Sequence, residues 1–388
     1  MRLETRRMLF GGAVTVLLCL LTYASASGQA APEPRPQMAE QAFKNIQVLR
    51  GIPVDEFMDT MGMFAASLSL NCVDCHAANA DSSGSWDAFA VETPLKRTTR
   101  RMVAMVNALN KANFGGTTRV TCWTCHRGDQ RPKNVPSLAV QYTEPASDPN
   151  DTETAFQPLG IPGAPSADQV FDKYFQAIGG AQRLAGLTGY AAKGTYFGFE
   201  TAMVKVPVEI FARAPNQRAT FVQTPFGPSV RTYDGRAGWI ASPDRPAPLL
   251  PLTGGNLTGA RIEAVASFPA QLRQVVPTWR VGQTFIDDVD VWMLEGLAAG
   301  QPPVKLFFDK ESGLLVRLAH FGDTAVGRVP VQIDYADYRE ANGVKVPFSW
   351  VTTWTTGQAT TELTEVQLNV AIDAAKFARP VPTPRPNP

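Results

Sequence analysis

Apolar residues in the first third of the chain recur at intervals of three and four, which is the spacing of an amphipathic helix. The pattern covers residues 39–70 and is interrupted at Gly51-Ile52-Pro53, so two helices are predicted there. A third helix is predicted from Pro94 to about Asn110. The first 130 residues are therefore expected to be α-helical with short connections.

Beyond residue 165 the pattern changes to short stretches of alternating apolar and polar residues, which is typical of β-strands. A short helix is predicted over 166–178 before these stretches, and another over 261–276 interrupts them. This order predicts a mostly antiparallel sheet with one or two helices on one face. The strand candidates include 206–212, 219–223, 289–295, 304–308 and 314–321, with turns at Asp234-Gly235, Ser312-Gly313 and Asn342-Gly343.

The N-terminus has the features of an export signal. Three arginines precede an apolar run over residues 8–23, and Ala24-Ser25-Ala26 offers small residues for cleavage near Ala26. We therefore expect a periplasmic protein; the run is shorter than the about 20 residues that span a bilayer, but its retention as a membrane anchor stays open. The predicted units are the signal peptide 1–26, a Pro-rich spacer 27–40, a helical domain 41–132, a Pro-rich linker 133–165, the sheet domain 166–379 and a disordered tail 380–388.

Composition narrows the class of protein. A formal net charge of +1 and a charged fraction of 18% give no field that would attract nucleic acid, which is excluded as a partner. The 31 glycines and 31 prolines fit turn-rich β structure and a linker better than an all-helical chain. The five cysteines and three histidines are so few that their positions restrict the chemistry.

Two C-x-x-C-H motifs, at residues 72–76 and 122–126, match the attachment motif of c-type haem. Two thiols three residues apart can form thioethers with both vinyl groups of one porphyrin, and the adjacent imidazole reaches the iron. A zinc site would need four ligands shared by both motifs, and a dithiol redox site would not need the histidine. The sequence therefore predicts two covalently bound haem c groups, attached through Cys72, Cys75, Cys122 and Cys125, with His76 and His126 as proximal iron ligands; Cys19 lies in the signal peptide.

The distal iron ligands follow by elimination. The remaining histidine, His320, lies in the sheet domain beyond a long linker, where a packed histidine is the simpler interpretation. Methionine is the other common distal ligand of low-spin c-type haem, and methionines cluster before each motif. The candidates are Met58, Met61 and Met63 before Cys72, and Met102 and Met105 before Cys122; these methionines could also be core residues, since methionine packs well.

Residues 43–132 resemble the cytochrome c subunit family of photosynthetic reaction centres and its smaller non-photosynthetic relatives. The resemblance implies a helix, a turn and a haem motif at each site, with a helix methionine as distal ligand. It selects Met61 and Met102, with Met58 and Met105 as the alternatives. The matching contexts are Phe43-Lys-Asn-Ile-Gln-Val-Leu49, Glu56-Phe57 with Met61, Asn71-Cys72-Val-Asp-Cys-His76, Lys96 with Arg100-Arg101-Met102, and Val120-Thr-Cys-Trp-Thr-Cys-His-Arg-Gly128.

The sequence also departs from that family. The photosynthetic subunit carries four haems, whereas two motifs are present here, and the loop from Lys111 to Val120 lacks the histidine of its bis-His haem. Docking to a reaction centre is therefore not expected. The C-terminal half weakly resembles lipoprotein-carrier half-barrel domains, which implies a curved antiparallel sheet and a place for an apolar ligand.

Together these patterns predict a periplasmic dihaem c-type cytochrome that moves single electrons between a donor and an acceptor, which are periplasmic or membrane-bound. It is expected to be an electron carrier rather than an enzyme, because both axial positions of each iron are filled. Two alternatives stay open. One is a dihaem oxidoreductase or peroxidase with a labile distal ligand, and the other is a haem-bearing envelope protein that binds a lipid or quinone.

Overall fold

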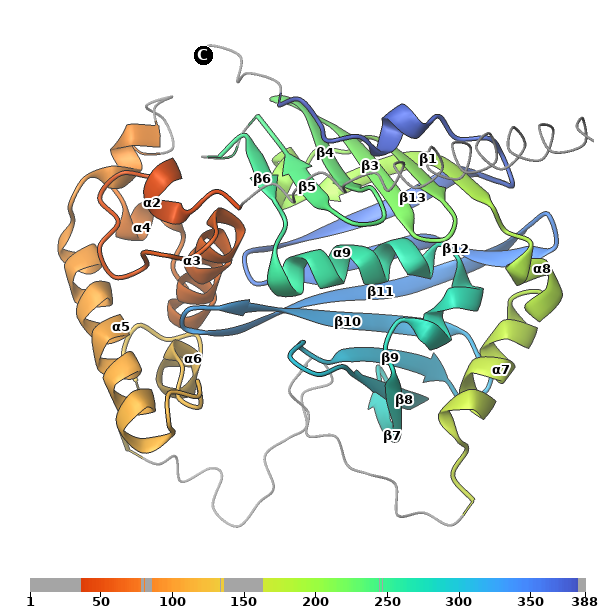
Figure 1. The fold of residues 1–388 in the computed structure, drawn as a ribbon, viewed down its shortest axis with the longest axis horizontal. Coiled ribbons are helices and arrows are strands. Elements are labelled where there is room, and N and C mark those ends of the chain that lie inside the picture. The colour runs from red at the N-terminus through yellow and green to blue at the C-terminus, as the bar shows by residue number, and fades with distance from the viewer. Residues whose placement is uncertain are drawn as a thin grey trace, which may run out of the picture. The chain divides into compact units, whose positions relative to one another are not determined.

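The computed structural model describes residues 36–77, 80, 86–132, 134–135, 163–243, 245 and 247–382. The predicted signal peptide, most of the predicted linker and the end of the tail lie outside the described residues. Helical elements precede a sheet along the chain (Figure 1). The helical part consists of α2 (Ala39–Ala42), α3 (Val54–Leu68), α4 (Cys72–Cys75), η1 (Trp86–Ala90), α5 (Pro94–Asn113) and α6 (Cys122–His126).

The residues at the ends of the two long helices, α3 and α5, explain where these helices begin and end. Helix α3 follows Pro53 and ends at Ser69, which has a left-handed φ of 50°. Helix α5 has Pro94 in its first turn, and its cap Thr93 accepts a hydrogen bond from the Lys96 amide. None of the described helices combines the length and the apolar content needed to cross a membrane.

The prediction of a helix across residues 43–50 is wrong, because long-range contacts hold this segment in irregular structure. Asn45 has a φ of 60°, and its side-chain amide donates to the carbonyl of Ala90 over 2.8 Å. Ile46 and Leu49 nevertheless pack inward, into a cluster that includes Val103 of α5. The apolar spacing therefore predicted the inward positions of Ile46 and Leu49, but not the exposure of Val48 or the backbone conformation.

The sheet is antiparallel throughout and has thirteen strands, in the order β6-β5-β4-β3-β2-β1-β13-β12-β11-β10-β9-β8-β7. Two meanders thus join where the first strand pairs with the last, and the predicted fold class is confirmed. The Asn342-Gly343 turn has positive φ at both residues, as a tight hairpin requires. The strands are β1 (Gly189–Gly198), β2 (Val206–Arg213), β3 (Gln217–Thr224), β4 (Gly227–Tyr233), β5 (Gly238–Ala241), β6 (Leu249–Pro251), β7 (Thr278–Ile286), β8 (Val289–Leu297), β9 (Val304–Asp309), β10 (Leu315–Thr324), β11 (Gly327–Ala341), β12 (Val344–Trp354) and β13 (Gly357–Leu368).

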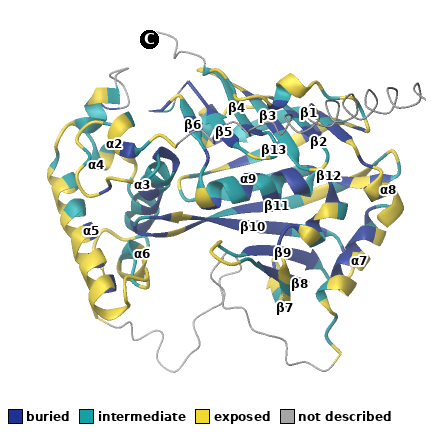
Figure 2. Cartoon of the chain, viewed as in Figure 1, coloured by how far each residue is buried: buried dark blue, intermediate teal, exposed yellow. Residues whose placement is uncertain are grey.

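Helices pack on the sheet and form one large core with it. Helices α7 (Ala167–Ala177), α8 (Ala181–Ala185) and α9 (Gly254–Ala266) contribute buried apolar residues to this core, which appears dark blue on the strands in Figure 2. Short 3-10 helices complete the fold: η3 (Phe199–Thr201), η4 (Pro269–Gln274) and η5 (Ala374–Phe377).

Helix α9 begins seven residues before the predicted start at Arg261 and ends before Pro269. Its early part contains glycines that pack closely on β10. A Cβ at Gly255 would lie 2.4 Å from the carbonyl oxygen of Phe321, and one at Gly259 would lie 2.3 Å from the His320 ring. These glycines let helix and strand approach, although they gave the segment the sequence signal of a loop.

Helix α3 joins the helical part to the sheet. Its Asp55 carboxylate accepts hydrogen bonds from the Thr253 amide and hydroxyl at the N-terminus of α9. One turn later, Asp59 accepts a 2.6 Å hydrogen bond from Asn256. Apolar contacts flank these bonds: Val54 packs on Ala247 and Leu250, and Met63 packs on Val326 and Val329.

We predict that Asp55→Ala destabilises the chain by about 1–3 kcal/mol, because it leaves the amide and hydroxyl donors of half-buried Thr253 without their buried acceptor. Urea unfolding followed by circular dichroism measures this change. Asp87→Ala is the matched control, since Asp87 forms an exposed ion pair with Lys44 whose loss costs about 0–1 kcal/mol. Equal effects of the two substitutions would show that the α3–α9 contact does not contribute more than a surface pair.

Candidate haem sites

The first motif occupies a short, well-capped helix. The Asn71 side chain accepts hydrogen bonds from the amides of Val73 and Asp74, and the Asp74 carboxylate accepts one from the Asn71 amide. These reciprocal bonds fix a single helical turn between Cys72 and Cys75. Cys72 is exposed and Cys75 is half-buried, so both thiols lie within reach of a large group outside the protein.

The second motif repeats this arrangement in α6. Thr121 caps the helix by accepting from the Thr124 amide, and Arg127 ends it with a left-handed φ of 50°. Cys125 is exposed, and half-buried Cys122 packs beside the buried cluster of α3. The exposed Trp123 lies between the two cysteines.

The two motif histidines are oriented in the same way. His76 Nδ1 lies 2.9 Å from the carbonyl oxygen of Phe89, and His126 Nδ1 lies 2.9 Å from that of Asp129. A carbonyl oxygen only accepts hydrogen bonds, so Nδ1 is the protonated nitrogen in each ring. Nε2 then carries the lone pair that an iron ligand needs.

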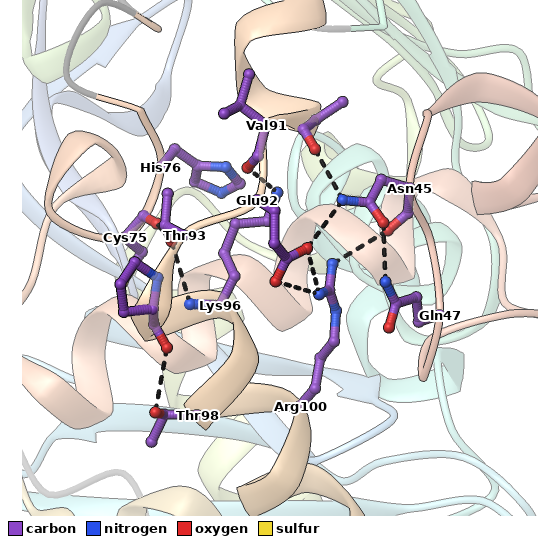
Figure 3. A network of polar contacts seen from close by, with 12 residues as sticks. Asn45, Gln47, Cys75, His76, Val91, Glu92, Thr93, Lys96, Thr98 and Arg100 are labelled. Carbon is purple, nitrogen blue, oxygen red and sulfur yellow. Dashed lines mark hydrogen bonds and ion pairs between the residues drawn. The ribbon is translucent and has the colours of Figure 1, made fainter.

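A polar network ties the first motif to the start of α5 (Figure 3). Thr93 donates from its hydroxyl to the carbonyl of Cys75, and Lys96 donates to the carbonyls of Phe89 and Val91 over 2.9 and 2.8 Å. The acceptor of His76 therefore also receives a hydrogen bond from a lysine. Burial is the main cause that lowers the pKa of Lys96.

The two motifs meet through the end of α3. The Gly128 amide donates to the Ser67 carbonyl over 3.0 Å, and the Ser69 hydroxyl donates to the Gly128 carbonyl over 2.7 Å. Ser69 precedes the first motif by three residues, and Gly128 follows the second by two. Two segments 59 residues apart in sequence are thereby fixed side by side.

The candidate methionines lie in different surroundings. Met63 is buried against the turn between β10 and β11, whereas Met58 and Met61 are half-buried. Met102 and Met105 lie on α5 with 36% and 50% of their surface exposed. The role of these methionines as iron ligands stays a prediction.

Helix α5 has an apolar face that protein covers only in part, as its largely yellow surface in Figure 2 shows. Val103 and Val106 are buried. Leu95, Met102 and Leu109 follow each other at intervals of seven, so they share one face of the helix, and all three are exposed. A porphyrin is a flat apolar group of the kind that would cover such a face.

The chemistry of the thiols fits haem better than the other predicted uses. Burial raises the pKa of the Cys75 and Cys122 thiols, whereas reactive dithiol sites lower it. No group of three or more potential metal-ligating His, Cys, Asp or Glu side chains occurs among the described residues, so the two motifs do not converge on a zinc ion there. The four motif cysteines are free of disulfides.

His320 lies inside the sheet domain. It is 2% exposed, and its Nε2 lies 3.0 Å from the Glu263 carboxylate, which also pairs with Arg231. Burial disfavours the charge on Glu263, but the Arg231 guanidinium and the His320 hydrogen bond outweigh it and lower its pKa to about 2. His320 is therefore part of a buried polar network with Glu263 and Arg231.

Comparison with known proteins shows which family the helical part is similar to. Residues 21–169 match the family model described as the photosynthetic reaction centre cytochrome C subunit. The resemblance expected from the haem motifs is confirmed. The chain is 37% identical over 100 residues to the photosynthetic reaction center cytochrome c subunit of Thermochromatium tepidum, and 30% identical over 112 residues to that of Rubrivivax gelatinosus. The matches cover 24% and 28% of this chain and 23% and 28% of those relatives, so the chain spans about a quarter of their length.

Solved structures resemble the sheet part. A LolA superfamily protein from Nitrosomonas europaea covers 55% of this chain and 98% of its own length, at 12% identity and a TM-score of 0.37. A DUF1329 family protein from Desulfovibrio piger covers 54% of this chain and 96% of its own length, at 8% identity and a TM-score of 0.38.

Asn110 is a site residue that the sequence did not reveal. It is 4% exposed on α5; its side-chain oxygen accepts from the amides of Arg119 and Val120, and its amide donates to the Val120 carbonyl. These three bonds fix the segment that enters the second motif. An asparagine near a helix end gives no sequence signal for such a role.

We predict that Asn110→Ala destabilises the second motif by about 1–3 kcal/mol, because the amides of Arg119 and Val120 lose the buried side-chain oxygen that accepts from them. Thermal unfolding, followed by the visible absorption of the haem-loaded protein, measures the loss. Asn113→Ala is the matched control, since Asn113 is exposed and donates only to the Leu109 carbonyl. A melting temperature unchanged by Asn110→Ala would contradict the assignment.

Glu263 predicts a dependence of stability on pH. Its pKa of about 2 in the folded chain lies below the ordinary 4.5, so its charge stabilises the fold above pH 4.5 and this contribution is lost as the pH falls toward 2. Glu263→Gln should cost about 3 kcal/mol at pH 7 and progressively less between pH 4.5 and 2. Urea unfolding of both proteins across this range tests the prediction, and a constant difference would refute it.

Proposed function

We propose that this protein is a periplasmic electron carrier with two covalently attached haem c groups, each iron held by a histidine and a methionine. The hydrogen bonds that join Ser67 and Ser69 to Gly128 are the observation that carries the proposal, because they hold the two attachment motifs beside each other. Haem iron, when bound, supplies reversible one-electron oxidation and reduction. Adjacent sites let an electron pass from one to the other.

Each residue has a distinct task in this function. Cys72, Cys75, Cys122 and Cys125 hold the porphyrins, and His76 and His126 present Nε2 because their Nδ1 atoms are anchored to carbonyl oxygens. Met61 on α3 and Met102 on α5 supply the distal sulfur, with Met58 and Met105 as alternatives. A thioether is a soft, weak donor that favours ferrous iron and raises the potential relative to a second histidine.

His320 supports methionine ligation by its location. Its Nε2 is engaged by Glu263 and its ring packs on Gly259 of α9, so it is held within the sheet part. With two histidines assigned as proximal ligands, the sequence contains no other histidine for a distal position. A donor and an acceptor of single electrons, periplasmic or membrane-bound, are the partners that this chemistry requires.

A ligand-binding role for the sheet is the less favoured alternative. One pocket among the described residues, lined by Val170, Lys173, Trp292 and Phe308, has about 50 Å³, which is room for a few water molecules but not for a lipid chain. The aromatic residues around it form core contacts, as Phe171 does with Phe308. We assign the sheet the role of a support for α3.

Redox titration of ligand variants tests the proposal. We expect two haems per chain in the pyridine haemochrome assay, and Met61→Ala and Met102→Ala should each lower the midpoint potential of one haem and open it to carbon monoxide. Met58→Leu and Met105→Leu, one helical turn away, are the matched controls and should leave both potentials unchanged. Strong carbon monoxide binding by the reduced wild type would instead favour the oxidoreductase alternative.

A further inference from the structure

The two haem motifs lie in segments of opposite charge. Residues 110–132, around the second motif, contain four cationic side chains and one carboxylate, a net charge of +3 with neutral histidine. Residues 70–93, around the first, contain four carboxylates and no lysine or arginine. The near-zero charge of the whole chain hides this asymmetry.

Around the first motif, charged side chains are engaged in the structure. Arg100 pairs with Glu92 over 2.7 Å, Lys44 pairs with Asp87 over 2.7 Å, and Lys96 donates to two carbonyls of the adjacent loop. Figure 3 shows part of this network. The two ion pairs therefore cancel much of the field of Glu92 and Asp87 at this motif.

Around the second motif, the cations are exposed and form no ion pair with any described residue: Lys111, Arg119, Arg127 and Arg131. Arg119 is held near the end of α5 by the Asn110 bonds, and Arg127 directly follows the proximal histidine. We call these four residues and Trp123 the cationic patch. Trp123 is 46% exposed between the two cysteines.

The backbone adds a second observation. Arg127 has a left-handed φ of 50°, a conformation that glycine or asparagine adopts at lower cost than arginine. Unfavourable backbone at a fixed position is often retained where the side chain serves a function. Tryptophan and arginine are also the residue types enriched among the dominant contacts of protein interfaces.

We propose that the cationic patch is the docking surface for an acidic electron-transfer protein, which exchanges electrons through the second haem. This inference rests on the proposed function. Opposite charge would steer the partner to this motif, and Trp123 would provide the apolar centre of the contact. Because guanidinium groups stay charged at all physiological pH values, the steering depends on salt but hardly on pH.

The test measures second-order electron-transfer rates by stopped flow, with the haem-loaded full chain and two protein probes. An acidic blue-copper protein should react faster as the ionic strength falls, and a basic monohaem cytochrome c should react more slowly. Arg119→Glu combined with Arg131→Glu should slow the acidic probe about tenfold or more at about 0.01 M salt, and hardly at all at about 1 M. Arg127→Asn, which suits the left-handed backbone, should slow it less but in the same salt-dependent way.

Lys345→Glu on β12 is the matched control, since it reverses an exposed charge on the strand that begins after the Asn342-Gly343 turn, and it should leave both rates unchanged. The proposal is overturned if the patch variants keep the wild-type salt dependence. It is also overturned if they act by shifting the haem potentials, which would mean that the arginines neutralise haem carboxylates. A sedimentation assay tests binding of the wild type and the patch variants to phosphatidylglycerol vesicles. If the patch variants no longer sediment with the vesicles but keep the wild-type electron-transfer rates, the proposal is overturned in favour of a membrane surface.

Failure of this inference can be told from failure of the proposed function. If electrons are exchanged with both probes at rates that do not depend on the patch, the protein is a carrier without this docking surface. If neither probe exchanges electrons at any ionic strength, the carrier function itself fails. The absorption spectrum of each variant confirms that both haems are attached before any rate is compared.

Discussion

The burial of helix α3 is the constraint on which the rest of the structure depends. One end of this helix places Asp55 against the N-terminus of α9, and the other end binds Gly128 behind the second motif. Because α9 packs on β10 as well as on β3 and β4, a single helix connects the core of the sheet to both haem motifs.

Covalent attachment explains a feature that ordinary protein packing would not. Helix α5 buries Val103 and Val106 but exposes Leu95, Met102 and Leu109 on an adjoining face. Exposed apolar residues in a row usually mark a surface that something covers. Here the two motifs with accessible thiols belong to the same helical part as α5, and haem is the group that the matched cytochrome family implies. In the proposed carrier, the same face packs against a haem and supplies a distal ligand through Met102.

Local chemistry decided what could be predicted from the sequence. The haem motifs, the caps of α5 and the Asn342-Gly343 turn depend on neighbouring residues, so their spacing was informative. The hydrogen bond between Asp55 and Thr253 joins residues 198 apart in the sequence, and no local sequence pattern predicts it. The carbonyl oxygens that orient His76 and His126 belong to the main chain, which no residue type reveals. The irregular conformation of residues 43–50 and the early start of α9 were missed for the same reason, because contacts with distant residues determine both.

The charged side chains are distributed unevenly between the two motifs, although the net charge of the chain is close to zero. Asp55 and Asp59 of α3 are turned into the contact with α9, and Asp87 and Glu92 near the first motif are paired with Lys44 and Arg100. The cations near the second motif are left exposed. A neutral chain can thus present a local positive field without the self-repulsion that a large net charge would cause. The Ser69 hydroxyl donates to the Gly128 carbonyl, so the two motifs lie side by side although their charged surroundings differ. In the proposed carrier, this difference in charge means that the second motif selects its partner electrostatically, whereas the first motif does not.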